Sequence, residues 1–199
     1  MGETRQTTDP LEAKRLARLE ARLAMEGLSL GQAAEDSQAV CRLILESAVW
    51  KEAGQAMLYM PISGEIDVKP LIKKGLEVGK AIALPRFSSK NNVYQPCVIA
   101  NLGDLVLGKF GIPEPSPGSQ KMDTKQLDLV IVGGVAFDGF GGRLGRGGGF
   151  FDRLLADIPA KKCGACFDQQ VHTDVPVERH DVKMDMIATP SGWLIPPPA

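Results

Sequence analysis

The alternation of short apolar segments with helical segments constrains the fold of this chain more than any other feature of its sequence. The apolar segments with the length and composition of buried strands are residues 56–60, 81–85, 96–100, 127–137, 163–167 and 184–188. Helical patterns lie between them at residues 68–78 and 150–158. Strands that alternate with helices commonly pair in parallel, because each helix returns the chain to the same edge of the sheet. The sequence therefore predicts a single α/β domain, a three-layer Rossmann-like α/β/α arrangement around a mostly parallel sheet.

Two further helices precede the first predicted strand. Asp9 is a good N-cap residue, and Glu12 stands where it would complete a capping box. Ser29 and Gln32 repeat this spacing at the start of a second helix, which we expect to end before Gly54. Both helices are expected to pack on the sheet.

The first of these helices has two different faces. One face carries an apolar stripe formed by Leu16, Leu19 and Leu23. Another face carries Lys14, Arg18 and Arg22, which follow one another at intervals of four residues. Such a row of charges is commonly a solvated helix face, but it also suits an anionic ligand.

Length and charge narrow the class of protein. A chain of 199 residues with 44 % hydrophobic residues suits one domain, here residues 1–199. Lys and Arg number 23 against 24 Asp and Glu, whereas nucleic-acid binders usually have a basic excess. No segment is apolar for long enough to span a bilayer, and the N-terminal segment lacks the apolar centre of a signal peptide. We therefore expect a cytoplasmic protein that binds neither nucleic acid nor membranes. The near-zero net charge is compatible with a monomer.

Cys163 and Cys166 form a C-x-x-C pair within a strand-like segment. Residues three apart on a strand point to opposite faces, so the two thiols should diverge. A redox pair needs its first cysteine at a helix start, and structural zinc needs four convergent ligands. We therefore interpret both residues as core cysteines.

The strand predicted at 127–137 leads into a glycine-rich loop, DGFGGRLGRGGGFFDR, at residues 138–153. In open α/β sheets, ligands bind at the carboxyl ends of the strands. Glycines let the backbone approach a ligand closely, and the start of the next helix offers free N–H groups to an anion. Arg143 and Arg146 add two positive charges. This combination predicts a polyphosphate-binding site.

The loop matches none of the standard nucleotide-binding patterns. It contains neither G-x-x-x-x-G-K-[ST] nor G-x-G-x-x-G. A glycine-rich turn whose arginines are solvated on its rim is therefore an alternative. The two arginines inside the loop, followed by Asp152, favour the functional interpretation.

The segment RLGRGGGFFDR resembles the signature R-L-G-x-G-x-G-[YF]-Y-D of the 5-formyltetrahydrofolate cyclo-ligase family. Lys14 and Arg18 resemble the N-terminal K-x-x-x-R of that family. Further segments resemble family elements in the same order: MPISGEID, FGIPEP and FDQQVHTDVPVERHDVKMDMIAT. The likeness covers nearly the whole chain.

The resemblance implies an ATP-dependent enzyme of folate one-carbon metabolism. Its substrates would be ATP and 5-formyltetrahydrofolate, its cofactor Mg²⁺, and its products 5,10-methenyltetrahydrofolate, ADP and phosphate. A formamide oxygen is a poor leaving group, which explains the need for ATP. Transfer of the γ-phosphoryl group would give a phosphorylated formyl intermediate, and ring closure would then expel phosphate. The protein would contribute positioning and charge neutralisation.

The resemblance also implies a role for individual residues. Arg143 and Arg146 would be the catalytic residues, because guanidinium forks match phosphoryl oxygens. ATP would be bound by Lys14, Arg18, Arg143, Leu144, Gly145, Arg146, Gly147, Gly148, Gly149, Phe150 and Phe151. Reduced folate would be bound by Met60, Glu65, Arg146 and Phe150. Magnesium would be coordinated by Asp152 and Asp185.

Three positions depart from the family pattern. Gly133 stands where the family usually has proline, which makes the turn less rigid. Phe150 and Phe151 replace a tyrosine pair, so that the stacking surface is kept and two hydroxyl groups are lost. Pro190 replaces an acidic residue.

Two other functions remain open from the sequence. A sugar-phosphate isomerase would share the fold type and a phosphate loop, but it needs a general base, and no residue stands out for that role. A nucleotide- or folate-binding regulatory module without turnover is compatible with the loss of both tyrosines. Turnover of ATP and 5-formyltetrahydrofolate would separate these possibilities.

Overall fold

The computed structural model describes residues 9–198. The α-helices are α1 (Pro10–Ala24), α2 (Leu30–Glu46), α3 (Ala48–Glu52), α4 (Lys69–Glu77) and α5 (Phe150–Leu155). The 3₁₀ helices are η1 (Leu102–Asp104), η2 (Lys109–Gly111), η3 (Thr124–Gln126) and η4 (Asp168–Gln170). The strands are β1 (Gln55–Met57), β2 (Ala81–Ser88), β3 (Val93–Val98), β4 (Val106–Leu107), β5 (Pro113–Glu114), β6 (Leu129–Val132), β7 (Ala136–Asp138), β8 (Arg143–Leu144), β9 (Lys161–Ala165), β10 (Val171–His172), β11 (Met186–Thr189) and β12 (Gly192–Leu194).

The main sheet has seven strands in the order β12-β11-β9-β6-β1-β2-β3. The five central strands run parallel, from β11 through β9, β6 and β1 to β2. The two edge strands, β12 and β3, are antiparallel to their neighbours. The prediction of an α/β domain with a mostly parallel sheet is therefore confirmed.

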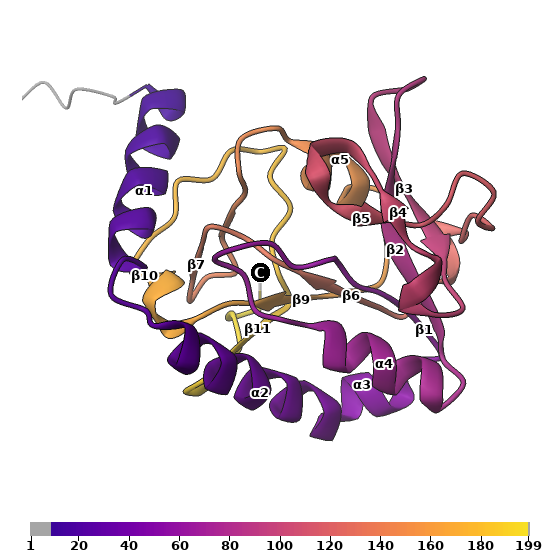
Figure 1. The fold of residues 1–199 in the computed structure, drawn as a ribbon. Coiled ribbons are helices and arrows are strands. Elements are labelled where there is room, and N and C mark those ends of the chain that lie inside the picture. The colour runs from indigo at the N-terminus through magenta and orange to yellow at the C-terminus, as the bar shows by residue number, and fades with distance from the viewer. Residues whose placement is uncertain (1–8, 199) are drawn as a thin grey trace, which may run out of the picture.

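Helices cover both faces of this sheet (Figure 1). Leu129 and Ile131 of β6 point to the face covered by α2 and α4, whereas Val130 and Val132 point to the face covered by α5. All four side chains are fully buried. A central strand buried on both faces explains the continuous apolar segment in the sequence.

The core cysteines follow the same alternation. Cys163 packs in the cluster beneath α2, and Cys166 packs in the cluster beneath α5. The two thiols therefore diverge, as predicted, and both are fully buried. Burial raises the pKa of the Cys163 thiol to about 12.

The prediction of one strand at residues 127–137 is wrong in one respect, because this segment forms two strands. β6 ends at Val132, and β7 belongs to a separate three-stranded sheet with β8 and β10. The chain bends at Gly134, where a Cβ atom would lie 2.7 Å from the ring of Phe137. An apolar run cannot reveal such a bend, since glycine is neutral in the hydrophobic pattern. The bend directs the glycine-rich loop across the carboxyl ends of the central strands.

The first helix has its predicted start but not its predicted orientation. The Asp9 side chain accepts from the backbone N–H of Leu11, whereas Glu12 pairs with Arg15 instead of completing a capping box. The stripe of Leu16, Leu19 and Leu23 is exposed, at 41 %, 43 % and 54 %. The buried residues are Lys14 and Ala21, and α1 lies against β7 and η4. Lys14 and Arg18 of the charged face therefore turn inward, because they find ionic and hydrogen-bonding partners there, whereas Arg22 is exposed.

The second helix begins where predicted and ends earlier. The Ser29 hydroxyl accepts from the N–H of Gln32. The helix stops at Glu46, and Ser47 caps the short α3 that follows. No helix within residues 9–198 combines the length and apolar character needed to cross a membrane.

Candidate active site

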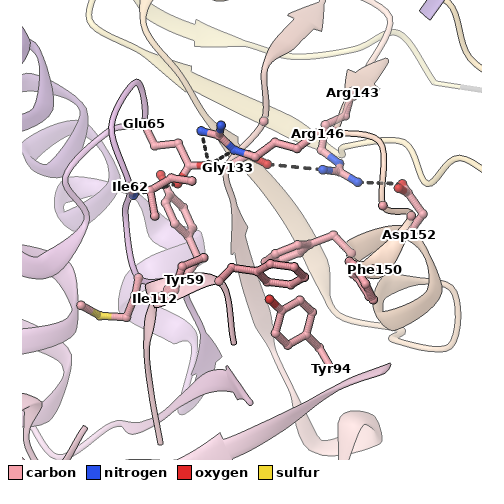
Figure 2. A pocket seen from close by; sticks show the side chains of 17 residues that line it. Tyr59, Ile62, Glu65, Tyr94, Ile112, Gly133, Arg143, Arg146, Phe150 and Asp152 are labelled. Carbon is pink, nitrogen blue, oxygen red and sulfur yellow. Dashed lines mark hydrogen bonds and ion pairs between the residues drawn. The ribbon is translucent and has the colours of Figure 1, made fainter. Parts of the chain in front are cut away.

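The glycine-rich loop and the carboxyl ends of the central strands enclose a pocket of about 530 Å³ (Figure 2). Its lining residues are Tyr59, Met60, Ile62, Glu65, Tyr94, Phe110, Ile112, Gly133, Gly134, Arg143, Gly145, Arg146, Gly148, Gly149, Phe150, Phe151 and Asp152. They come from the segment after β1, from β3, from the β4–β5 and β6–β7 connections, from β8 and the loop that follows it, and from the start of α5. The pocket lies where ligands bind in open α/β sheets.

Arg143 and Asp152 form a buried ion pair in the pocket wall. Arg143 Nη2 donates to Asp152 Oδ1 over 2.7 Å, and the side chains are 2 % and 14 % exposed. Arg143 Nη1 also donates to the carbonyl of Gly133 over 3.4 Å. The Nε atom of Arg143 is buried without a partner among the described residues. The guanidinium is therefore fixed in place, although one of its N–H groups lacks a hydrogen-bond partner among the described residues.

The loop between Arg143 and α5 offers backbone donors. Gly147 and Gly149 have φ angles of 102° and 62°, which favour glycine at both positions. Within residues 9–198, no N–H group of residues 145–149 donates to a protein acceptor. Consecutive free N–H groups beside a fixed arginine suit a polyanion.

Arg146 and Glu65 form a second, looser ion pair. Arg146 Nε and Nη2 each lie 3.3 Å from Glu65 Oε1, and Arg146 Nη2 also donates to the carbonyl of Ser63. The Arg146 side chain is 52 % exposed, whereas that of Glu65 is 12 % exposed. Burial raises the pKa of Glu65, although the N–H of Ile62 and the Arg146 guanidinium favour its charged form. The pair joins the glycine-rich loop to the segment after β1.

Aromatic side chains form the opposite wall of the pocket (Figure 2). The ring of Phe150 lies 5.7 Å from Tyr94 and 5.9 Å from Phe110, and the ring of Phe151 lies 5.9 Å from Tyr94. Ring pairs at these distances are favourable in edge-to-face or tilted orientation. This wall suits a flat organic ligand of moderate size.

A smaller cavity of about 220 Å³ adjoins the pocket. Both cavities are lined by Arg146 and Gly134. Arg18 and Arg22 of α1 also line the smaller one. Arg18 Nε donates to the carbonyl of Gly145 over 2.8 Å, so α1 supports the glycine-rich loop. Three guanidinium groups around one cavity suit an anion.

Comparison with known proteins identifies the family. The model of the 5-formyltetrahydrofolate cyclo-ligase family matches residues 10–190. The chain belongs to this family. This confirms the resemblance seen in the sequence and the prediction of a ligase-type enzyme.

Individual relatives agree with the family match. The chain is 30 % identical over 183 residues to a probable 5-formyltetrahydrofolate cyclo-ligase of Schizosaccharomyces pombe, covering 81 % of this chain and 90 % of the relative. It is 34 % identical over 149 residues to the 5-formyltetrahydrofolate cyclo-ligase of Escherichia coli, covering 67 % and 76 %. The solved structure of 5,10-methenyltetrahydrofolate synthetase from Aquifex aeolicus superposes with a TM-score of 0.80 at 28 % identity, covering 96 % and 94 %.

The structure brings most of the residues assigned by the family resemblance to the two cavities. Those that line the larger pocket are Met60, Glu65, Arg143, Gly145, Arg146, Gly148, Gly149, Phe150, Phe151 and Asp152. Arg18 lines the smaller cavity, and Gly147 lies against the Arg18 guanidinium. Leu144 lies apart, because its side chain packs in a core cluster with Ala21 and Val175.

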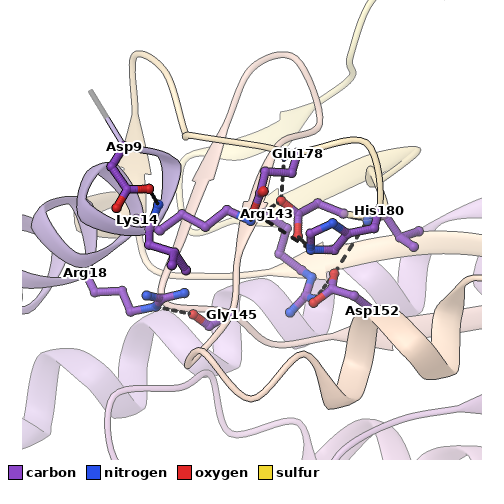
Figure 3. A network of polar contacts seen from close by, with 11 residues as sticks. Asp9, Lys14, Arg18, Arg143, Gly145, Asp152, Glu178 and His180 are labelled. Carbon is purple, nitrogen blue, oxygen red and sulfur yellow. Dashed lines mark hydrogen bonds and ion pairs between the residues drawn. The ribbon is translucent and has the colours of Figure 1, made fainter. Parts of the chain in front are cut away.

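Lys14 is engaged elsewhere in this cyclo-ligase family member (Figure 3). Its Nζ donates to Glu178 over 2.8 Å and to Asp181 over 2.5 Å. Burial alone would lower the pKa of Lys14, but these two hydrogen bonds outweigh it and raise the pKa. The ammonium group is thus paired with carboxylates, and it lines neither cavity.

Asp185 is not brought together with Asp152. Its Oδ2 atom accepts from the backbone N–H of Lys162 over 2.8 Å, and its Oδ1 atom lies 3.6 Å from Lys161 Nζ. Lys161 and Lys162 begin β9, so Asp185 lies at the amino-terminal edge of the parallel strands, opposite the pocket. The structure therefore does not support the pairing of Asp152 with Asp185 around one metal ion.

Two buried polar residues that the sequence analysis did not single out hold the site together. Gln170 Nε2 donates to the carbonyls of Gly134 and Gly64, and its Oε1 accepts from the N–H of Phe167. Asp138 accepts from the N–H groups of Phe140, Gly142 and Val175. Some of these contacts are local, but those to Gly64, Gly134 and Val175 join segments distant in sequence, so they became apparent only in the folded structure.

Part of the pocket was also missed. The lining residues without a predicted role are Tyr59, Ile62, Tyr94, Phe110, Ile112, Gly133 and Gly134. Tyr59 lies at the carboxyl end of a predicted strand and Ile62 follows it, which was an available signal. Tyr94 was missed because β3 begins at Val93, before the segment predicted as a strand.

Proposed function

We propose that this protein catalyses the ATP- and Mg²⁺-dependent cyclisation of 5-formyltetrahydrofolate to 5,10-methenyltetrahydrofolate, with release of ADP and phosphate. One observation carries the proposal. A buried arginine and a half-exposed arginine line the pocket together with the glycine-rich loop, whose N–H groups at residues 145–149 have no acceptor among the described residues, and the other wall of the pocket is aromatic. That arrangement suits a polyphosphate beside a flat organic substrate.

The aromatic part of the pocket would hold the folate rings. Phe150 would stack on them, and Met60 lines the same space. Glu65 would accept hydrogen bonds from N–H groups of the pterin ring. Its nearly buried carboxylate strengthens such bonds, because few water molecules compete for it.

The cationic part would hold the ATP phosphates. Arg143 and Arg146 would bind the transferring group, and the loop N–H groups would bind the remaining phosphate oxygens. Arg18 would act from the smaller cavity, which Arg146 also lines. Lys14 would act indirectly, by anchoring α1 through Glu178 and Asp181.

The chemistry would proceed in two steps. The formyl oxygen attacks the γ-phosphorus atom, and ADP departs with the electrons of the broken P–O bond. The neighbouring folate nitrogen then attacks the activated formyl carbon, loses its proton, and phosphate leaves to give the methenyl bridge. In the first step the charge of the transferring phosphoryl group is spread over its equatorial oxygens, where the guanidinium groups would stabilise it.

The donor set supports one carboxylate ligand for magnesium. Asp152 Oδ1 is bound by Arg143, whereas Asp152 Oδ2 has no partner among the described residues and its side chain lines the pocket. Magnesium commonly takes one or two carboxylates together with phosphate oxygens and water. Bound there, the ion would neutralise phosphate charge.

The test is turnover of ATP and 5-formyltetrahydrofolate by the purified protein, with both ADP and 5,10-methenyltetrahydrofolate measured. We expect both products in equal amounts, and none without magnesium. Binding of both ligands without products would instead indicate a regulatory module. Failure to bind reduced folate would contradict the proposal.

A further inference from the structure

We propose that Tyr94 contacts the reduced folate directly and that its hydroxyl is the hydrogen-bonding group of the aromatic wall. Tyr94 would then be a specificity-determining residue of the pocket. This inference rests on the proposed function, since it takes reduced folate as the ligand.

The first observation is that, within the described part of the chain, one tyrosine hydroxyl is free to bind a ligand. The chain has only two tyrosines. Tyr59 is buried, and its hydroxyl donates to the carbonyl of Ile66 over 3.1 Å. Tyr94 lines the pocket, and its hydroxyl makes no hydrogen bond within residues 9–198. The Tyr94 hydroxyl is therefore the phenol available to a ligand.

The second observation is that this hydroxyl is accessible. The buried side-chain atoms that lack a partner belong to Glu114, Arg143 and His172 among the described residues. The Tyr94 oxygen is not among them, although the residue is half-buried. A group that is open to the pocket and unpaired can exchange water for a ligand atom at little cost.

The third observation is that Tyr94 is held rigidly. Its ring lies 5.8 Å from Phe87, 5.7 Å from Phe150 and 5.9 Å from Phe151. These neighbours are phenylalanines and offer no polar atom. Burial raises the pKa of Tyr94, and the nearby carboxylate of Glu114 raises it further, so the phenol keeps its proton and can donate. A phenol donor thus stands among rings that carry no hydrogen-bonding group of their own.

Such a donor discriminates between ligands that an apolar wall would accept equally. A reduced folate carries nitrogen and oxygen atoms along the edges of its rings and in its amide. A ligand with an acceptor opposite Tyr94 gains a hydrogen bond, whereas one without it leaves the phenol unpaired. The expected effect on affinity is that of one neutral hydrogen bond, roughly three- to tenfold.

The experiment measures binding of 5-formyltetrahydrofolate, without ATP, to the full chain and to Tyr94→Phe. We expect the dissociation constant to rise roughly three- to tenfold, with ADP binding unchanged. Tyr94→Phe keeps the ring, so the aromatic packing and the fold are preserved. Equal folate affinity in both proteins, or equal weakening for folate and ADP, would overturn the inference.

A rescue experiment tests the hydroxyl itself. Phe150→Tyr and Phe151→Tyr, each combined with Tyr94→Phe, return a phenol to a ring that packs against position 94. Recovery of affinity in either double variant supports the inference. If the unaltered protein binds no reduced folate, the proposed function itself fails, and that result is distinct from a failure of Tyr94 alone.

Discussion

At the scale of single residues, the two arginines of the glycine-rich loop differ in freedom. The side chain of Arg143 is 2 % exposed and paired with Asp152. The side chain of Arg146 is paired with Glu65 but remains 52 % exposed to solvent. A buried pair holds its geometry, while an exposed pair exchanges partners easily. Arg143 is therefore suited to positioning the phosphate in the ground state. Arg146 is suited to following the phosphoryl group during its transfer.

We predict that Arg146→Ala lowers kcat on the order of a hundredfold or more, with a much smaller change in the ATP dissociation constant. Arg146→Lys should recover only part of the rate, because lysine supplies charge without the fork. The measurement is kcat beside the ATP dissociation constant for each variant. Loss of ATP affinity at unchanged kcat would mean that Arg146 binds only ground-state phosphate.

Asp152 has two roles that one substitution can separate. Asp152→Asn should raise the magnesium concentration needed for half-maximal turnover, roughly tenfold or more, because a charged ligand becomes neutral. The same change leaves the buried charge of Arg143 unpaired and should lower the free energy of unfolding. A magnesium titration and a denaturant titration measure the two effects independently. Unchanged magnesium dependence together with reduced stability would leave Asp152 as a partner of Arg143 only.

At the scale of elements, Gln170 joins three segments that carry the pocket. Its side chain links η4 to the Gly64 segment, to the Gly134 bend and to Phe167 at the end of β9. The first two of these segments present Glu65 and Gly133 to the pocket. Gln170 therefore fixes the spacing between the folate side of the pocket and the bend that leads into the glycine-rich loop.

We predict that Gln170→Met, which keeps the volume and removes the hydrogen bonds, lowers the free energy of unfolding by about 1–3 kcal/mol. It should also raise the KM for folate more than the KM for ATP, because the segment that carries Glu65 loses its hydrogen bond to Gln170. The adjacent Gln169 is exposed, so Gln169→Met is the matched control and should change stability by less than about 0.5 kcal/mol. Equal effects of the two substitutions would contradict this role.

At the scale of the whole molecule, Lys14 joins the two ends of the described chain. Its partners Glu178 and Asp181 lie 164 and 167 residues away in sequence. Burial alone would raise the pKa of Asp181, but hydrogen bonds from Lys14 and from the N–H of Glu178 outweigh it and hold the pKa below 3.8. The pKa of Lys14 is raised above 10.5. Lys14 and Asp181 are therefore both charged over a wide pH range.

The directions of these pKa shifts determine how the stability of the fold depends on pH. A carboxyl with a depressed pKa in the folded state stabilises the fold above its unfolded pKa and loses this contribution as pH falls through the folded value. We predict that Asp181→Asn lowers the free energy of unfolding by about 1–3 kcal/mol at neutral pH. The difference from the unaltered protein should shrink below about pH 4. Denaturant unfolding at several pH values measures it, with exposed Asp174→Asn as control. A difference that is independent of pH would refute the ionic explanation.

The sheet and the chemistry of the glycine-rich loop could be predicted from the amino-acid sequence alone. A strand that is buried on both faces needs consecutive apolar residues. This requirement is met within single segments such as residues 129–132, so it can be recognised in the sequence. The glycines and arginines of residues 143–149 are likewise adjacent in the chain, so their joint function was visible as a motif.

Features that depend on partners distant in sequence became apparent only in the folded chain. The leucine stripe of α1 faces solvent because Lys14 and Arg18 find partners on the other side, at Asp181 and Gly145. Asp185 lies at the opposite edge of the sheet from Asp152, because its carboxylate binds the backbone at the start of β9. Whether a charged side chain binds a ligand or a neighbour is set by the competing groups within a few ångströms, and those groups come together only when the chain folds.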